Sequence, residues 1–268
     1  MIRPIALLLA APALLSAAPR LPRVVSINPC VDAVLARVAD PAQIVGISHY
    51  SQDVRATSVP LGWARRFKAT SGTAEEVMAL RPDIVLAGPH VEPATIAALK
   101  RLKIALVQYP VAESVTESMD QVRAIATATG HAARGEVLAA RIAASATPAR
   151  VPPVGALVWQ GNGLVPGSGT LADDLLQRAG FRNMSAKYGL KQWDVLPLEY
   201  LVADPPRVLL STAPEGVQDD RMTGHPAVRR LAMHITVAPY PTRLMNCGGP
   251  TIIAAMARLR QVHAQVTS

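Results

Sequence analysis

A short unit of helical turn, proline stop and apolar run is the clearest pattern in the chain, and it occurs twice. Residues 73–88 read TAEEVMALRPDIVLAG and residues 198–212 read LEYLVADPPRVLLST, and an offset of 124 positions carries Glu75 onto Glu199. A helix does not run easily through a proline, and a short apolar run bounded by Gly or Pro is typical of a parallel strand covered on both faces. The repetition predicts two similar α/β lobes. From the pattern alone, each Glu is a solvated first-turn residue of a short helix.

Apolar runs and helical periods alternate along the rest of the chain as well. Strands that alternate with helices form parallel sheets. Two segments, 49–71 and 183–195, lack a clear period but contain aromatic side chains, which favours functional loops over disorder. Besides the repeated unit, we expect strands at 23–27, 44–47, 104–108, 154–159 and 235–238, and helices at 31–38, 93–102, 115–130, 132–146, 171–179, 225–231 and 250–264.

A proline-rich segment near the middle of the chain, residues 148–153, is the predicted boundary between the two halves. The long helical period before it is the predicted connector. We therefore expect an α/β fold of two Rossmann-like lobes with parallel sheets, joined by a single long helix. The N-terminal lobe covers residues 19–130, the connecting helix 131–149 and the C-terminal lobe 150–268.

The first 18 residues, MIRPIALLLAAPALLSAA, have the composition of a secretory signal peptide. Arg3 precedes an apolar run that is too short to span a bilayer, and small residues follow it. Cleavage is expected after Ala17 or Ala18, which predicts a mature protein that is soluble outside the cytoplasm.

Composition adds a basic character to this picture. The 27 Lys and Arg against 19 Asp and Glu give a net charge of +8, and half of the residues are apolar, enough for a sizeable core. A basic surface can meet nucleic acid, anionic lipid or an acidic ligand. Export and the scattered placement of the basic residues argue against nucleic acid.

Sequence templates for catalysis are mostly missing. The segment around Ser168 has neither the lysine of a phosphate loop nor the spacing of a nucleophile elbow, so Ser168 is interpreted as a loop residue or ligand contact. The six histidines lack the spacings of zinc enzymes. His49 and His90 could converge as metal ligands, although lone surface histidines are more common. We predict no catalytic residue, no metal site and no cofactor.

Aromatic and basic side chains in the predicted loops suggest a binding crevice instead. Ligands of open α/β sheets bind beyond the carboxyl ends of the strands, where Trp and Tyr offer flat apolar walls and Arg offers charge-assisted hydrogen bonds. The alternative is that each Trp fills the core of its own lobe and each Arg is a solvated surface charge. The candidates are Trp63, Trp159, Trp193, Arg65, Arg66 and Arg243.

The two cysteines, Cys30 and Cys247, lie nearly at opposite ends of the mature chain, and both are expected in loops facing the crevice. They form either a disulfide that closes a very long loop or two free thiols that contact a ligand or metal. The sequence leaves both possibilities open.

Four motifs in order carry a family resemblance over the whole mature chain: RVVSINPC, EEVMALRPDIVLAG, GSGTLADDLLQRAGFRN and LPLEYLVADPPRVLL. Together they resemble the periplasmic substrate-binding proteins of ABC importers for cobalamin, haem and iron siderophores, whose lobes are joined by one long helix and hold the ligand in a cleft between them. The resemblance implies that Glu75 and Glu199 lie on the outer faces of the lobes and pair with Arg residues of the permease.

The resemblance further implies a monomer that delivers a small-molecule ligand to an ABC permease/ATPase complex in the inner membrane. The three Trp fit a cobalamin binder and the three Arg fit a siderophore binder, so a metal chelate of either kind is expected. Haem is the alternative within the family, with Tyr50, His49 or His90 as its ligand. An exported α/β enzyme or a sensor-partner domain using the same cleft is the alternative outside it.

Overall fold

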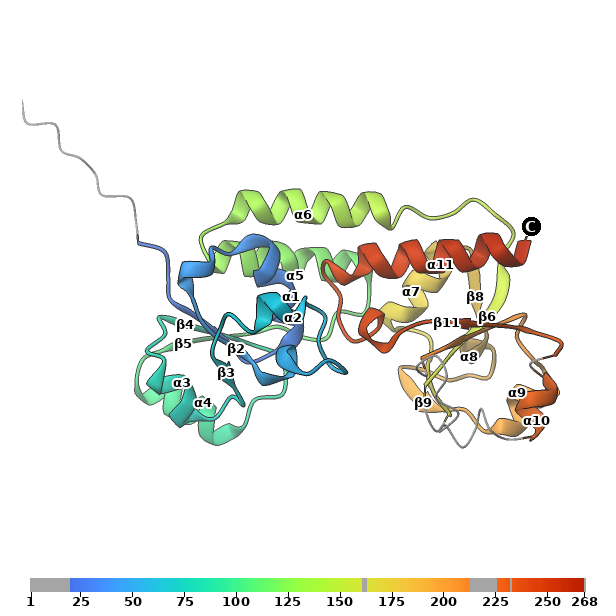
Figure 1. The fold of residues 1–268 in the computed structure, drawn as a ribbon, viewed down its shortest axis with the longest axis horizontal. Helices are drawn as coiled ribbons and strands as arrows, with labels where there is room; N and C mark the ends of the chain where they lie inside the picture. The colour runs from blue at the N-terminus through green and yellow to red at the C-terminus, as the bar shows by residue number, and fades with distance from the viewer. Residues whose placement is uncertain (1–19, 161–162, 213–225, 232, 268) are drawn as a thin grey trace, which may run out of the picture.

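The computed structural model describes residues 20–160, 163–212, 226–231 and 233–267. Two α/β lobes lie beside each other, and a row of helices runs along one side of both (Figure 1). The signal peptide expected over residues 1–18 lies outside the described residues. None of the described helices combines the length and hydropathy that a membrane span requires.

Each lobe contains a parallel sheet, and the two strand orders match apart from one additional edge strand, β3, in the N-terminal lobe. The order in the N-terminal lobe is β3-β2-β1-β4-β5, and in the C-terminal lobe it is β11-β10-β6-β8. Without β3, the two orders are β2-β1-β4-β5 and β8-β6-β10-β11, so in both sheets the first of these strands lies between the second and the third, with the fourth outside the third. The strands are β1 (Val24–Ser26), β2 (Ile44–Ser48), β3 (Ala69–Thr70), β4 (Ile84–Ala87), β5 (Ala105–Gln108), β6 (Val154–Trp159), β8 (Phe181–Asn183), β10 (Val208–Ser211) and β11 (Thr236–Pro239).

The repeated unit of the sequence forms the same two elements in each lobe. In the first lobe it gives helix α3 (Ala74–Ala79) and β4; in the second it gives helix α9 (Leu198–Ala203) and β10. The offset that relates the two glutamates also carries both ends of α3 onto those of α9, and both ends of β4 onto those of β10. The predicted duplication is therefore confirmed at the level of single elements.

Three long helices form the backbone of the molecule: α5 (Val115–Ala128), α6 (Ala132–Ser145) and α11 (Thr251–Thr267). Helix α6 packs against α5 and also against α11 from the end of the C-terminal lobe (Figure 1). The sequence predicted one connecting helix over 131–149, but α6 ends at Ser145, because prolines at 148, 152 and 153 cannot continue a helix. Residues 146–153 lead to β6 without helical structure.

Smaller elements occupy the segments predicted as loops. Residues 49–71 contain two helical turns and β3, and residues 183–195 contain a helical turn and a strand that pairs antiparallel with β7. The remaining elements are α1 (Pro29–Val38), η1 (Pro41–Gln43), η2 (His49–Gln52), α2 (Leu61–Ala64), α4 (Pro93–Arg101), β7 (Leu164–Pro166), α7 (Leu171–Arg178), α8 (Met184–Lys187), β9 (Trp193–Val195), α10 (Pro226–Leu231) and η4 (Thr242–Leu244).

One hydrophobic core crosses the boundary between the lobes. A contiguous buried cluster contains Leu35 and Ile142 from the N-terminal half together with Phe181 and Met256 from the C-terminal half. Separating the lobes would expose this apolar surface to water, which is unfavourable in proportion to its area. The shared core therefore opposes a wide hinge motion between them.

Candidate functional site

A cavity of about 470 Å³ lies between the lobes, with walls from both halves of the chain. Several of its residues directly follow a strand: Asn28 comes soon after β1, Gly88 after β4, Tyr109 after β5 and Gln160 after β6. The carboxyl ends of parallel strands meet at one edge of a sheet, and ligands of open α/β sheets bind there. The fold thus places the cavity where the two sheets present these edges to each other.

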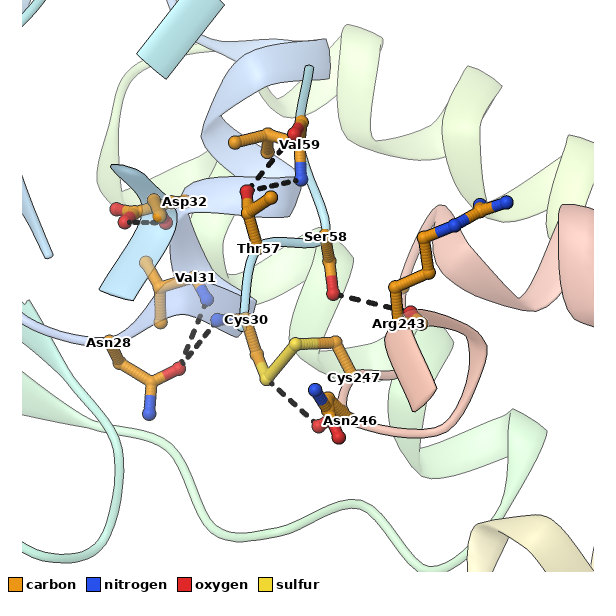
Figure 2. Close-up of a disulfide and its surroundings, with 12 residues drawn as sticks. Asn28, Cys30, Val31, Asp32, Thr57, Ser58, Val59, Arg243, Asn246 and Cys247 are labelled. Carbon is orange, nitrogen blue, oxygen red and sulfur yellow. Dashed lines mark hydrogen bonds between the residues drawn. A yellow bond between two sulfur atoms is a disulfide. The ribbon is translucent and has the colours of Figure 1, made fainter. Parts of the chain in front are cut away.

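The first turn of α1 forms one wall, and Asn28 fixes it. The Asn28 Oδ1 atom accepts hydrogen bonds from the backbone N–H of Cys30 at 2.8 Å and of Val31 at 3.3 Å (Figure 2). Asn is among the preferred residues at this position because its side chain satisfies N–H groups that have no partner within the helix. The local sequence Asn-Pro-Cys therefore both starts the helix and brings Cys30 to the cavity.

A disulfide between Cys30 and Cys247 joins the two lobes at this wall (Figure 2). The Cα atoms lie 5.1 Å apart, within the ordinary range for a disulfide, although 217 positions separate the residues in sequence. Of the two possibilities left open by the sequence, the structure has the disulfide and not the free thiols. Both cysteines line the cavity as one covalent link, Cys30 from the first turn of α1 and Cys247 from the segment before α11.

Two hydrogen bonds from backbone N–H groups to side-chain oxygens reinforce the contact between the lobes near the disulfide. Ser118 on α5 accepts from the N–H of Gly249 at 2.6 Å, and Asp174 on α7 accepts from the N–H of Val115 at 2.8 Å. Gly248 leaves room for this approach, since a Cβ there would lie 2.4 Å from the Ser118 hydroxyl oxygen. The segment before α11 is therefore closely packed against the N-terminal lobe.

Side-chain links span the lobes at two further places. Gln192 donates from Nε2 to Glu113 Oε1 at 3.0 Å, and both residues line the cavity. On the disulfide side, the Ser58 hydroxyl donates to the carbonyl oxygen of Arg243 at 3.4 Å (Figure 2). The cavity is therefore bordered by polar contacts between the lobes as well as by the covalent one.

Only one of the three tryptophans reaches the cavity. Trp193 lies in its wall with 41% of its surface exposed, whereas Trp159 is 2% exposed in the core of the C-terminal lobe. Trp159 shares a face of β6 with Leu157, because side chains alternate across a strand, and that face is covered within its own lobe. Trp63 packs on Phe67, with ring centroids 4.8 Å apart, beside the N-terminal core. The alternative interpretation, in which each Trp packs within its own lobe, is therefore correct for Trp63 and Trp159.

The three arginines proposed for the crevice lie elsewhere. Arg65 and Arg66 are exposed at the end of α2, and the Arg66 guanidinium sits 5.9 Å from the centre of the Phe67 ring. Arg243 borders a separate shallow hollow with Arg258, and its side chain extends away from the disulfide (Figure 2). Among the described residues that line the interlobe cavity, none is Lys, Arg or His.

Ser168 and Tyr50 are likewise absent from the described cavity wall. Ser168 pairs with Lys191 in an isolated β-bridge, so it acts as a loop residue of the C-terminal lobe. Tyr50 is 52% exposed, with its ring centroid 4.0 Å from that of His49, and His90 is exposed on the N-terminal lobe. Across the described residues, no group of three His, Cys, Asp or Glu side chains is placed to hold a metal ion.

Amide side chains are the part of the site that the sequence did not reveal. Amides are common on protein surfaces and form no spacing motif, so only their position soon after a predicted strand, as for Asn28 and Gln160, could have indicated them. Among the described residues, the cavity wall contains five of them: Asn28, Gln121, Gln160, Gln192 and Asn246.

Two buried titratable groups lie close to the cavity. Burial raises the pKa of the Tyr109 hydroxyl to about 12, and that hydroxyl has no hydrogen-bond partner among the described residues. Burial also raises the pKa of Asp32, on α1, to about 7, although its Oδ2 accepts from Ser51 Oγ at 2.6 Å and from the N–H of Ser48 at 3.0 Å. Asp32 therefore gains a proton easily while the protein stays folded.

The two repeated glutamates lie far from the cavity wall, on the surface. Glu75 on α3 and Glu199 on α9 are exposed, and neither forms an ion pair within the described part of the chain. Glu76, the neighbour of Glu75, differs, because its carboxylate accepts hydrogen bonds from Thr70 and Ser71. Helices α3 and α9 lie on separate lobes, on the side opposite the three backbone helices (Figure 1).

Comparison with known proteins gives consistent matches over most of the chain. A family model described as periplasmic binding protein matches residues 24–232. A cobalamin-binding protein of Halobacterium salinarum is 25% identical over 91% of this chain and 70% of its own length.

Two solved structures share the fold. The periplasmic haem-binding protein BhuT, in complex with two haems, superposes with a TM-score of 0.73 at 21% identity, covering 92% of this chain and 99% of that one. The periplasmic vitamin B12 binding protein BtuF of Vibrio cholerae gives a TM-score of 0.70 at 15% identity, covering 93% of this chain and 100% of that one.

Proposed function

This chain belongs to the periplasmic binding protein family, and on that premise we propose that it captures a metal chelate between its lobes and delivers it to an ABC permease. The observation that carries the proposal is the cavity of about 470 Å³ built from strand ends of both lobes. Its wall combines the half-exposed ring of Trp193 with fixed polar groups, the usual composition of a small-molecule site.

The ligand proposed is cobalamin or a ferric siderophore. A flat chelate ring can stack on Trp193, and such contacts add roughly 0.5–1.5 kcal/mol beyond burial. The halobacterial relative named as a cobalamin-binding protein favours cobalamin, and the fold shared with BtuF agrees with that choice. Haem is the second candidate within the same class, favoured by the fold shared with BhuT.

Glu75 and Glu199 are proposed as the contacts with the permease. They are matched in sequence, exposed, and free of ion pairs within the described residues, on the side away from the backbone helices. An exposed ion pair contributes only about 0–1 kcal/mol, so two such pairs orient the complex without making it permanent. A delivery protein requires that property because it must dissociate after unloading.

The proposal also covers the oligomeric state and the cellular location. Residues 1–18 act as a signal peptide, and the mature protein works in the periplasm as a monomer. It binds its ligand without turnover, and the cleft holds no catalytic group in this scheme.

The first experiment is to purify the mature protein from the periplasm of its source and to record its absorption spectrum and the mass of any bound ligand. Cobalamin, haem and ferric siderophores all absorb visible light, so a coloured preparation identifies the class directly. If the purified protein bound none of these chelates in a titration, the proposal would be refuted.

The docking assignment needs a separate test in a strain that depends on this importer. The double variant E75A/E199A is expected to bind its ligand normally and to lose import. A matched control removes two other exposed acids, Asp120 and Glu136, which lie on the backbone helices and contact Arg123. Full import by E75A/E199A, or equal loss in both double variants, would contradict the assignment.

A further inference from the structure

The charge and the amide groups of the cavity wall point to a narrower ligand class. We propose that this cavity selects chelates that carry no net negative charge and that present neutral hydrogen-bonding groups, such as carboxamides or hydroxamates, at their periphery. The inference rests on the proposed chelate-binding function, and it concerns which members of that class are accepted.

The first observation is the absence of positive charge where the chain as a whole is basic. The protein has 27 Lys and Arg, yet none of the described lining residues is Lys, Arg or His, and one of them is an acid, Glu113. Proteins usually bind carboxylates and phosphates through Arg or Lys, because an anion loses its hydration on entering a cavity and needs a charged partner. An anionic chelate finds no such partner on this wall and meets the Glu113 carboxylate.

The second observation is that the fold fixes the orientation of several wall amides. Gln192 Nε2 donates to Glu113 Oε1 at 3.0 Å and to the carbonyl oxygen of Gly169 at 3.3 Å. Gln121 Nε2 donates to the carbonyl oxygen of Pro110 at 2.8 Å. Because the N–H₂ groups are used in this way, each Gln keeps an Oε1 acceptor with no partner among the described residues.

Asn28 has the opposite arrangement. Its Oδ1 is held by the first N–H groups of α1, so the group left over is its N–H₂, a donor. The wall therefore offers acceptors and a donor at fixed places. A neutral amide can satisfy both kinds, since it has an N–H₂ and a carbonyl oxygen. A carboxylate has acceptors alone, so it could pair with the Asn28 N–H₂ but would leave the two Gln oxygens without a donor.

The apolar part of the wall completes the match to a neutral macrocycle. Trp193, Val31, Ile125 and the disulfide sulfur atoms border the same cavity. These groups contact hydrocarbon or ring surface without requiring any charge on the ligand. The wall therefore combines apolar contacts with neutral hydrogen-bonding groups and one acid, Glu113.

The test uses three matched pairs of probes that share metal and scaffold but differ in charge. They are cyanocobalamin and its monocarboxylate, in which one carboxamide is hydrolysed; haemin dimethyl ester and haemin; and ferrioxamine B and its N-succinyl derivative. Affinity for the purified mature protein is measured by quenching of tryptophan fluorescence and by calorimetry. In every pair that binds, the less negative member is expected to bind at least about tenfold more tightly, because the anion leaves buried groups unpartnered.

A second arm asks whether Glu113 contributes to the discrimination. The variant E113Q keeps the size of the side chain and removes its charge, so the ratio of the two affinities within a pair is expected to fall several-fold, and an unchanged ratio would exclude Glu113 from the discrimination. The control E136Q removes an equal charge on α6, remote from the cavity, and should leave both affinities unaltered.

The outcomes separate the two levels of the proposal. If a chelate binds but its anionic partner binds equally well or better, the charge selection is overturned and the chelate-binding function stands. If none of the six probes binds, the chelate-binding function itself fails, and the inference fails with it.

Discussion

Removing the disulfide between Cys30 and Cys247 is expected to cost more stability than any change on the surface. The perturbation is the double variant C30A/C247A, which deletes the link without leaving a reactive thiol. The linked residues are 217 positions apart, so the bond restricts almost the whole unfolded chain. The chain-entropy model gives roughly 18 cal/mol/K for a loop of this length, or about 5 kcal/mol at 25 °C. Typical domains are stable by about 5–15 kcal/mol, so this is a large fraction of the total.

The assay is urea unfolding followed by circular dichroism, with and without a reducing agent. The oxidised natural protein is expected to unfold at the highest urea concentration. Reduction should lower its urea midpoint to nearly that of the double variant, whose own midpoint should not respond to the reducing agent. The dependence of the unfolding free energy on urea should rise when the link is absent, because the unfolded chain then exposes more surface.

Without the bond, the shared core and hydrogen bonds such as Gly249 N–H to Ser118 are expected to hold the folded state together. A loss below about 1 kcal/mol would refute the entropic argument and would mean that the unfolded chain is already compact. If the double variant failed to fold at all, reduction of the folded natural protein would still give the comparison, since it starts from the native structure.

Three further predictions follow from burial and packing. Trp159→Ala should destabilise the protein by about 3–5 kcal/mol in the same urea assay, because Trp159 is 2% exposed, while Trp193→Ala should change stability little and weaken ligand binding; equal effects on stability would contradict the two placements. The pKa of Asp32 is raised to about 7, so its contribution to stability is present below about pH 4 and lost as pH rises through 7. Between these pH values the unfolding free energy of Asp32→Asn should increase relative to that of the natural protein by up to about 1.4 kcal/mol per pH unit. Parallel pH profiles of the two proteins would refute this. Gly88→Ala would place a Cβ 2.3 Å from Asn28 Nδ2. It should lower stability by roughly 1 kcal/mol, because Asn28 caps helix α1, and it should also reduce ligand affinity. An unchanged melting temperature and affinity would show that the amide can move aside.

The alternation of strands and helices was predictable because it depends on local pattern. Apolar runs between Gly and Pro gave β4, β6 and β10 within a residue or two, and the offset between Glu75 and Glu199 gave the duplication. The elements missed were short ones, such as β3 and the β7–β9 pair. Their two or three residues carry no measurable period, and they form because neighbouring segments supply hydrogen bonds.

The end of the connecting helix could be predicted from the sequence, whereas the number of backbone helices could not. Proline at 148 marks where the period must fail, but the packing of α11 onto α6 depends on contacts between residues more than a hundred positions apart. A pattern within one segment contains no information about which distant segment will cover it.

The sequence by itself determined the two matched lobes, their parallel sheets and the exposed acids Glu75 and Glu199. Only the tertiary structure decided that Cys30 and Cys247 are bonded, that Trp193 faces the cavity while Trp159 does not, and that the cavity wall is rich in amides. The physical reason is that secondary structure follows from the order of neighbouring side chains, whereas a site between two lobes is formed by strand ends and loops that meet only after the chain has folded.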